Sequence, residues 1–281
     1  MIKIERPTGD TSPLVLDSPH SGFMYPDDFN YVLDTRVLRR SEDAHIQDLF
    51  LPAVGFGATL IHALFPRCYI DPNRALEDLD TAMLDGPWPD PVNPSRKVER
   101  GAGLIWRQVK NRGLIYDRRL SVDEVKRRID SCWRPYHEAV AMILEETAAR
   151  HRGFIHLNCH SMASMGDPTT EDGPKPRPDM ILGDRDGTSC DPAITEVVRD
   201  LLQKQGYQVA VNDPYKGVEL VRRYSDPAKS RHSLQIEINR ALYMDEDSQE
   251  KLAGYSKLRD NLETLCEQLH GLGRELVADK S

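Results

Sequence analysis

The chain has 281 residues, of which 39% are hydrophobic and 29% charged, a composition typical of a globular protein with a large buried core. Its net charge of −8 argues against a nucleic-acid or anionic-membrane partner, because basic surfaces bind those. The five cysteines are scattered without a C-x-x-C pair and the N-terminus has no apolar leader, so we expect a cytoplasmic protein without disulfides or membrane-spanning segments.

The N-terminal third predicts strands that end in polar residues. The apolar run 14–16 indicates a short buried strand that stops at Ser18-Pro19 and is followed by His20. Further elements are an amphipathic helix over about 34–50, a strand over 58–64 and a short strand over 67–74 that breaks at Pro72. Residues 84–100 are rich in proline, glycine and charge, which is typical of a surface loop or lid.

The clearest predicted helix covers residues 121–151. Ser121 with Glu124 has the spacing of a capping box, and Pro135 should kink the helix or split it in two. A second apolar strand, 153–159, then runs into His160-Ser161 and repeats the ending seen at His20. Two strands that deliver a His-Ser pair to one sheet edge predict a bipartite metal site.

The C-terminal half continues to alternate strands with helices. The predicted elements are a strand over 179–184, a helix over 192–205, strands over 207–211 and 233–239, and a helix over 247–278. Because no repeat or linker interrupts this alternation, we expect one α/β domain over residues 1–281, with the sheet between two helical layers.

The candidate metal ligands are two imidazoles and one carboxylate. His20 and His160 supply the imidazoles, and Glu42 or Asp43 on the predicted helix supplies the carboxylate. A catalytic zinc takes three such ligands and keeps a position for water. A single histidine in a turn is more often structural, so it is the joint pattern that favours a metal.

Other charged residues have two interpretations each. Arg67, Asn73 and Arg74 could grip a substrate carboxylate, or they could form structural ion pairs with the acidic residues at 77, 78 and 80. Glu237 lies among apolar strand residues, where burial suits a general base. Its alternative is an exposed strand face or an ion pair with Arg240.

Six motifs in order resemble the N-formylglutamate amidohydrolase family from about residue 10 to 265. They are DSPHSG at 17–22, DPNR at 71–74, GAGLI at 101–105, NCHSM at 158–162, DMILGD at 179–184 and LQIEINRALYM at 234–244. The resemblance implies a three-layer α/β/α fold with a mixed central sheet, as in zinc-dependent exopeptidases and aspartoacylase-like enzymes. In that wider group a His-x-x-Glu pair and a later histidine hold zinc, an Asn-Arg pair binds the substrate carboxylate, and a late glutamate is the base.

Transferred to this chain, the resemblance implies Zn²⁺ held by His20, Asp43 and His160. Phe23 stands three residues after His20, where the wider group has its acidic ligand, so Asp43 takes that role, with Glu42 as the second choice. The resemblance also implies Glu237 as the base and Asn73 with Arg74 as the residues that bind the α-carboxylate. As a hypothesis for the mechanism, Arg67 stabilises the developing oxyanion, and the substrate side chain needs a further cation or donor, for which Arg223, Lys216 and His232 are candidates.

The expected reaction is hydrolysis of N-formyl-L-glutamate to glutamate and formate, the last step of one route of histidine breakdown. The same site could instead cleave another N-acyl amino acid or a peptide, or the chain could be a metal-binding relative without catalysis. The expected partner is therefore a small N-acyl amino acid, and the sequence indicates no oligomeric state.

Overall fold

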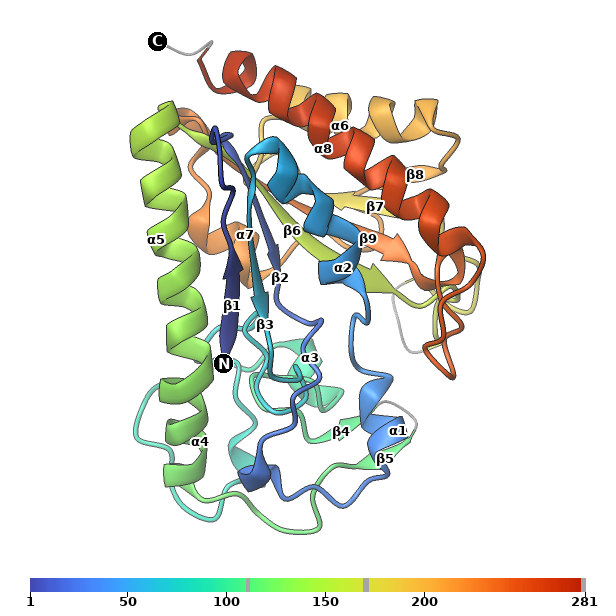
Figure 1. Cartoon of the computed structure of the whole chain (residues 1–281). Helices are drawn as coiled ribbons and strands as arrows, with labels where there is room; N and C mark the ends of the chain where they lie inside the picture. Colours follow the sequence, from blue (N-terminus) through green and yellow to red (C-terminus); the bar gives the residue numbers. More distant parts are fainter. Residues whose placement is uncertain (110–111, 169–171, 279–281) are drawn as a thin grey trace. The chain divides into compact units, whose positions relative to one another are not determined.

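The computed structural model describes residues 1–109, 112–168 and 172–278, in which strands alternate with helices (Figure 1). The strands are β1 (Ile2–Glu5), β2 (Leu14–Ser18), β3 (Thr59–Ala63), β4 (Gln108–Val109), β5 (Gly113–Leu114), β6 (Phe154–Met162), β7 (Met180–Gly183), β8 (Val209–Val211) and β9 (Arg231–Asn239). The helices are α1 (Thr35–Arg39), α2 (Ile46–Phe50), α3 (Arg96–Glu99), α4 (Val122–Arg128), α5 (Arg134–His151), α6 (Pro192–Lys204), α7 (Glu219–Tyr224) and α8 (Gly254–Ala278). None of the helices in these described ranges is both long and apolar enough to cross a membrane.

Seven strands form one mixed sheet in the order β1-β3-β2-β6-β9-β7-β8. The pairs β2–β6, β6–β9 and β7–β8 are parallel, whereas β7 runs antiparallel to β9. This arrangement confirms the predicted α/β fold with a mixed central sheet.

The chain forms two compact units. Unit 1 comprises Met1–Lys3, Pro19–Asp43 and His62–Ala139, and unit 2 comprises Ile4–Ser18, Ala44–Ile61 and Val140–Ser281. A single catalytic domain over residues 1–281 remains a prediction.

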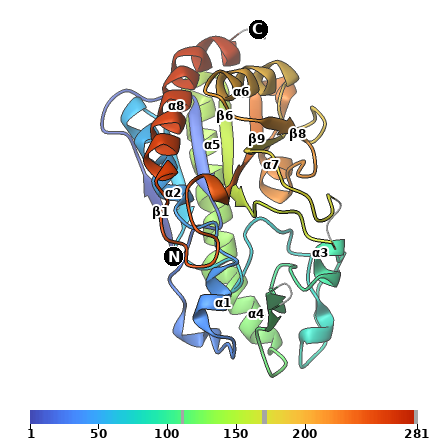
Figure 2. The ribbon, with the colours of Figure 1, turned by 90° about the vertical axis from the view of Figure 1, so that its right-hand side faces the viewer.

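Strands β2, β6 and β9 each have one mainly apolar and one mainly polar face, and both faces are buried. Leucine and isoleucine side chains on alternate positions of β2, β6 and β9 join those of α2, α6 and α8 in the main core. The intervening positions carry mostly polar side chains. Helix α7 also packs against β6 and β9. Figures 1 and 2 show α8 and α7 on opposite sides of these strands. Buried polar groups are costly unless they have hydrogen-bond partners or a function, so the polar face is the candidate location of the functional residues. Its members are Asp17, His156, Asn158, His160, Ser233, Gln235 and Glu237.

The continuous helix predicted over 34–50 is wrong. Residues 40–45 separate α1 from α2, and His45 has a left-handed backbone with φ of 67°, which no α-helix accommodates. The backbone N–H of Asp43 donates to the carbonyl of His20 at 2.9 Å instead of to a carbonyl one helical turn earlier. The interruption therefore ties Asp43 to the segment that follows β2.

The short strand predicted over 67–74 is also wrong, because this segment consists of turns. The Tyr69 N–H donates to the carbonyl of Pro66, and the Arg74 N–H donates to that of Asp71. In a strand, residues 67 and 71 would be separated by about 13 Å. In the turns their side chains form an ion pair at 3.0 Å.

The helix predicted over 121–151 begins as expected, and a π-helical turn just before Pro135 divides it into α4 and α5. Ser121 Oγ accepts a hydrogen bond of 3.1 Å from the Glu124 N–H, the first half of a capping box. Residues Ile129–Trp133 widen into a π-helical turn between α4 and α5, and the helix continues to His151. Proline has no N–H to donate, and a π-turn is one way in which a helix absorbs such an interruption.

Candidate active site

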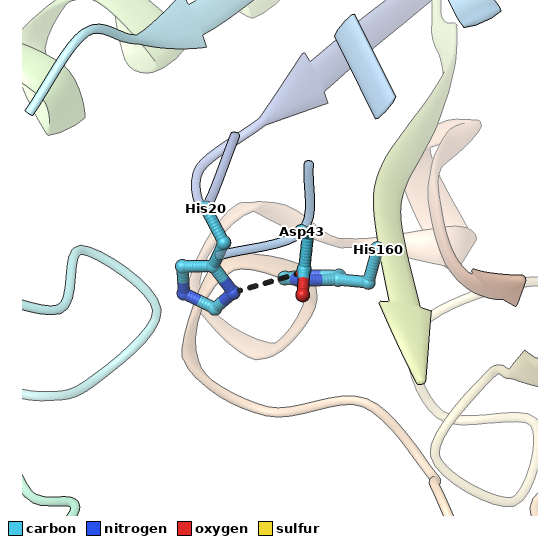
Figure 3. A group of neighbouring side chains, drawn as sticks. All are labelled: His20, Asp43 and His160. Atoms are coloured by element: carbon cyan, nitrogen blue, oxygen red, sulfur yellow. Dashed lines mark ion pairs between the residues drawn. The ribbon is translucent and has the colours of Figure 1, made fainter. Parts of the chain in front are cut away.

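Three of the predicted ligands, His20, Asp43 and His160, lie together and are buried. Each offers one ligand atom, and these atoms all lie within 4.8 Å of one another (Figure 3). His20 comes two residues after β2, Asp43 lies in the interruption before α2, and His160 is part of β6. Two imidazoles and a carboxylate make up a donor set that catalytic zinc sites use.

The ring of His20 is oriented by Asp71. Nε2 of His20 lies 2.7 Å from Oδ1 of Asp71. An ionised carboxylate only accepts hydrogen bonds, so Nε2 carries a proton, and in the neutral form of the ring Nδ1 is the nitrogen with the lone pair. Nδ1 is also the atom that faces Asp43, at 3.4 Å from Oδ2. A carboxylate behind a histidine is the usual way in which proteins orient a metal-binding imidazole.

Asp71 is itself held by several donors. Its Oδ1 also accepts from the backbone N–H of Asn73 at 2.9 Å, and its Oδ2 accepts from Arg67 Nη2 at 3.0 Å and from Trp106 Nε1 at 3.3 Å. Burial alone would raise the pKa of the Asp71 carboxyl, but the neighbouring His20 ring and two guanidinium groups hold that pKa well below its usual range. The Asp-Pro-Asn-Arg motif is visible in the sequence, but the role of Asp71 is not, because its partner His20 is 51 residues away in the chain.

Arg67 lies beside both carboxylates of this cluster. Besides its bond to Asp71, its Nη1 is 3.8 Å from Oδ1 of Asp43, and its guanidinium carbon lies 5.0 Å from the centre of the Trp106 ring. Its side chain is 14% exposed. This position is compatible with a contact to a substrate oxygen, which remains a prediction.

Glu42, the second choice for the acidic ligand, is engaged elsewhere. Its carboxylate accepts from the Tyr25 hydroxyl at 2.8 Å and from Arg39 Nε at 3.4 Å. The structure therefore brings Asp43, and not Glu42, to the two histidines.

Glu237 and His160 are direct neighbours on adjacent parallel strands. They are paired in the β6–β9 register, and Gln235 Nε2 donates to Glu237 Oε1 at 2.9 Å. Burial, followed by the nearby Glu237 charge, raises the pKa of Tyr215 to about 12. A carboxylate one strand away from a ligand histidine is suitably placed for a general base.

The Asn73-Arg74 turn is held rigidly. Trp133 Nε1 donates to the Arg74 carbonyl at 2.9 Å, and His137 Nε2 lies 2.8 Å from the carbonyl of Pro72. The Arg74 guanidinium group donates to the carbonyls of Asn73 and Ala102 and lies 3.8 Å from Asp78. The contact with Asp78 is the structural ion pair that the sequence left open, whereas carboxylate binding by Asn73 and Arg74 remains a prediction.

The three residues predicted for side-chain recognition are not brought together. Lys216 pairs with Asp186 at 2.9 Å, and Arg223 donates to Glu219 at 2.7 Å. His232 is five residues before Glu237 on β9, about 17 Å away along the strand, and belongs to the alternation that faces the main core.

Arg177 is a cation near Glu237 that the sequence did not indicate. Its guanidinium carbon lies 5.2 Å from the ring centre of Tyr215, a residue that also senses the Glu237 charge. Arg177 is paired with Asp172. Its loop position carries no motif, so only tertiary contacts reveal it.

The chain is similar in sequence and in fold to known proteins over most of its length. A family model described as N-formylglutamate amidohydrolase matches residues 12–244. The chain is 30% identical over 239 residues to N-formylglutamate deformylase of Pseudomonas putida, a match that covers 83% of this chain and 82% of that protein. A crystal structure of N-formylglutamate amidohydrolase from Ralstonia eutropha superposes with a TM-score of 0.93 at 45% identity, over 98% of each chain. A gene product of Agrobacterium tumefaciens has the same fold, with a TM-score of 0.63 at 18% identity over 95% of each chain.

Proposed function

The chain belongs to the N-formylglutamate amidohydrolase family, and on this basis we propose that it hydrolyses N-formyl-L-glutamate with a divalent metal ion bound by His20, Asp43 and His160. The products are L-glutamate and formate. The observation that carries the metal-dependent mechanism is the convergence of three ligand atoms from these residues within 4.8 Å.

The donor set fits a divalent metal with nitrogen preference, and we propose zinc. Nδ1 of His20 faces Asp43, and its Nε2–H donates to Asp71, so in the neutral ring the lone pair is on the nitrogen that faces the site. A bound divalent ion polarises an amide carbonyl and lowers the pKa of a water molecule on it.

Glu237 is the proposed general base. It takes a proton from the attacking water and returns that proton to the departing amine nitrogen of glutamate. Gln235 holds one oxygen of this carboxylate, and the side chain is 8% exposed, so Glu237 is fixed in orientation and yet accessible.

The cations of the site bind the negative charges of the substrate and of the transition state. Arg67 stabilises the developing oxyanion, and Asn73 with Arg74 binds the α-carboxylate. Arg223 and Lys216 remain candidates for the side-chain carboxylate. Arg177 is added to them because it lies near Glu237.

The decisive assay is turnover of N-formyl-L-glutamate by protein that has been stripped of metal and then reconstituted with zinc. We expect stoichiometric formate and glutamate, loss of turnover on chelation and recovery on adding zinc back. Full activity after complete chelation would contradict the metal role, and an inactive His160→Ala variant that still binds one equivalent of zinc would remove His160 from the ligand set.

A substrate panel separates the proposed reaction from its alternatives. It compares N-formyl-L-glutamate with N-acetyl-L-glutamate, N-formyl-L-leucine and a dipeptide. A preference for the acetyl compound or the dipeptide would indicate another deacylase or a peptidase, and no turnover despite zinc binding would indicate a metal-binding relative.

The cellular role is proposed on the same basis. Release of glutamate and formate suits the last step of histidine breakdown in the cytoplasm. A strain without this enzyme should accumulate N-formylglutamate when it grows on histidine.

A further inference from the structure

A chain of buried hydrogen bonds runs away from His160 on the polar face of unit 2. Nε2 of His160 lies 2.8 Å from Oδ1 of Asn158, and Nδ2 of Asn158 donates to Oδ1 of Asp17 at 2.8 Å. Nε2 of His156 reaches the same Asp17 oxygen at 2.8 Å, and Nδ1 of His156 lies 3.1 Å from Oγ of Ser233. All five residues are buried, and they come from three adjacent strands.

The direction of each bond follows from Asp17. An ionised carboxylate has no proton to donate, so the amide of Asn158 must turn its NH₂ toward Asp17 and its oxygen toward His160. The oxygen can only accept, so Nε2 of the neutral His160 ring carries the proton. Nδ1 is then the nitrogen with the lone pair.

The second arm of the network keeps Asp17 in place. Nε2 of His156 donates to Asp17, and in the neutral ring Nδ1 accepts from the hydroxyl of Ser233. A buried carboxylate needs such donors, since an unpaired one would be costly or would take up a proton. Protonation of Asp17 would remove the constraint on Asn158.

We propose that Asn158 and Asp17 are positioning residues that fix the tautomer of His160, with His156 and Ser233 holding Asp17. This inference rests on the proposed function, in which His160 binds the metal. The two ligand histidines are thus oriented differently, because a carboxylate contacts His20 directly whereas a neutral amide contacts His160. Because Asp17 fixes the orientation of the Asn158 amide, the amide oxygen accepts from Nε2 of His160. The neutral amide also adds no second negative charge next to a site that already contains Asp43.

The first test measures the tautomer in the metal-free protein. Long-range ¹H–¹⁵N correlation spectra of histidine-labelled protein distinguish protonated from unprotonated ring nitrogens, and a His160→Gln variant assigns the signals. We expect His160 to be protonated at Nε2 and unprotonated at Nδ1. A proton on Nδ1 would overturn the proposal, and this measurement needs no substitution in the network.

The second test removes the directing charge with Asp17→Asn, which has the same shape. The new amide can donate or accept, so Asn158 is no longer forced into one orientation. We expect a mixture of His160 tautomers and a loss of zinc affinity of about 10–100-fold, as for other residues that orient metal ligands. An Asn158→Ala variant should have the same effects, because it removes the acceptor itself.

Asp184→Asn is a matched control. Asp184 is another buried aspartate of unit 2, held by Thr195, Asn212 and the Gly187 N–H, and it does not belong to this network. The control should leave the His160 tautomer and the zinc affinity unchanged. Equal losses of affinity in Asp17→Asn and Asp184→Asn would indicate a general effect of lost stability and overturn the positioning role.

The two proposals fail in different ways. If His160 were not a ligand, His160→Gln would bind zinc like the wild type, while the tautomer measurement would still report on the network. If the network did not position His160, His160→Gln would lose zinc and Asp17→Asn would not.

Discussion

Replacing Asp71 by asparagine tests how much the cluster around His20 depends on one carboxylate. Asparagine keeps one oxygen, which can still accept from His20 Nε2 and from the Asn73 N–H. It places an NH₂ group where Arg67 donates at 3.0 and 3.3 Å and where Trp106 donates at 3.3 Å. Donors then face donors, and the guanidinium group of Arg67 loses the oxygen that accepts two of its N–H groups.

The loss of stability expected for Asp71→Asn follows from the burial of the two side chains. Asp71 is completely buried and Arg67 is 14% exposed, so water can replace the lost contacts only in part. Removing one partner of a buried ion pair lowers the free energy of unfolding by about 3–5 kcal/mol. Because Arg67 can be partly hydrated, we expect the lower end of this range, about 3 kcal/mol. Zinc affinity should fall by about 10–100-fold, because His20 loses its charged acceptor.

Urea denaturation of the metal-free protein and competition of zinc with a chromophoric chelator measure the two effects separately. Asp34→Asn serves as the control, because Asp34 pairs with Arg36 on the surface, where water replaces a lost ion pair, so the stability of this variant should stay close to that of the wild type. A folded Asp71→Asn protein with wild-type zinc affinity would refute the orienting role of Asp71.

Three further predictions concern the base, the carboxylate-binding turn and stability toward acid. Glu237→Gln should reduce kcat by about 10²–10⁴-fold at unchanged zinc affinity, whereas a parallel loss of zinc would make Glu237 a ligand. Arg74→Lys should raise KM more than it lowers kcat, since lysine lacks the planar fork; steady-state kinetics that show only a kcat effect would contradict substrate binding. Burial opposes ionisation of Glu124, but Arg118 and Arg128 outweigh it and lower its pKa, so its stabilisation is present above the usual carboxyl pKa of about 4.3 and is lost as the pH falls through the folded-state pKa. Glu124→Gln should therefore cost about 3 kcal/mol at pH 7, and the gap to wild type in urea unfolding should narrow below about pH 4; a constant gap would refute the assignment.

The strands that carry the site could be predicted from the sequence because a strand is indicated by the hydrophobic pattern of a few consecutive residues. Apolar runs at 14–16 and 153–159 identified β2 and β6, and the alternation of apolar and polar residues over 233–239 identified β9. The same local patterns located His20, His160 and Glu237 at or near strand ends. Motif order then indicated the family, which the comparisons confirm.

The rest depended on contacts between residues far apart in the chain. An amphipathic pattern over 34–50 could not reveal that the N–H of Asp43 binds the carbonyl of His20, which interrupts the helix and selects Asp43 over Glu42. The antiparallel pairing of β7 with β9 was likewise invisible, since a short apolar run fits either direction.

Sequence by itself determined which residue types this protein has for chemistry and that His20, His160 and Glu237 lie at or near strand ends. Tertiary structure alone determined how those residues are oriented, because the partners that orient them are distant in the chain. Asp71 is 51 residues from His20, and Asp17 is 141 residues from Asn158. A histidine becomes a ligand through the nitrogen that its partner leaves unprotonated, and hydrogen-bond partners of this kind leave no period or motif in the sequence.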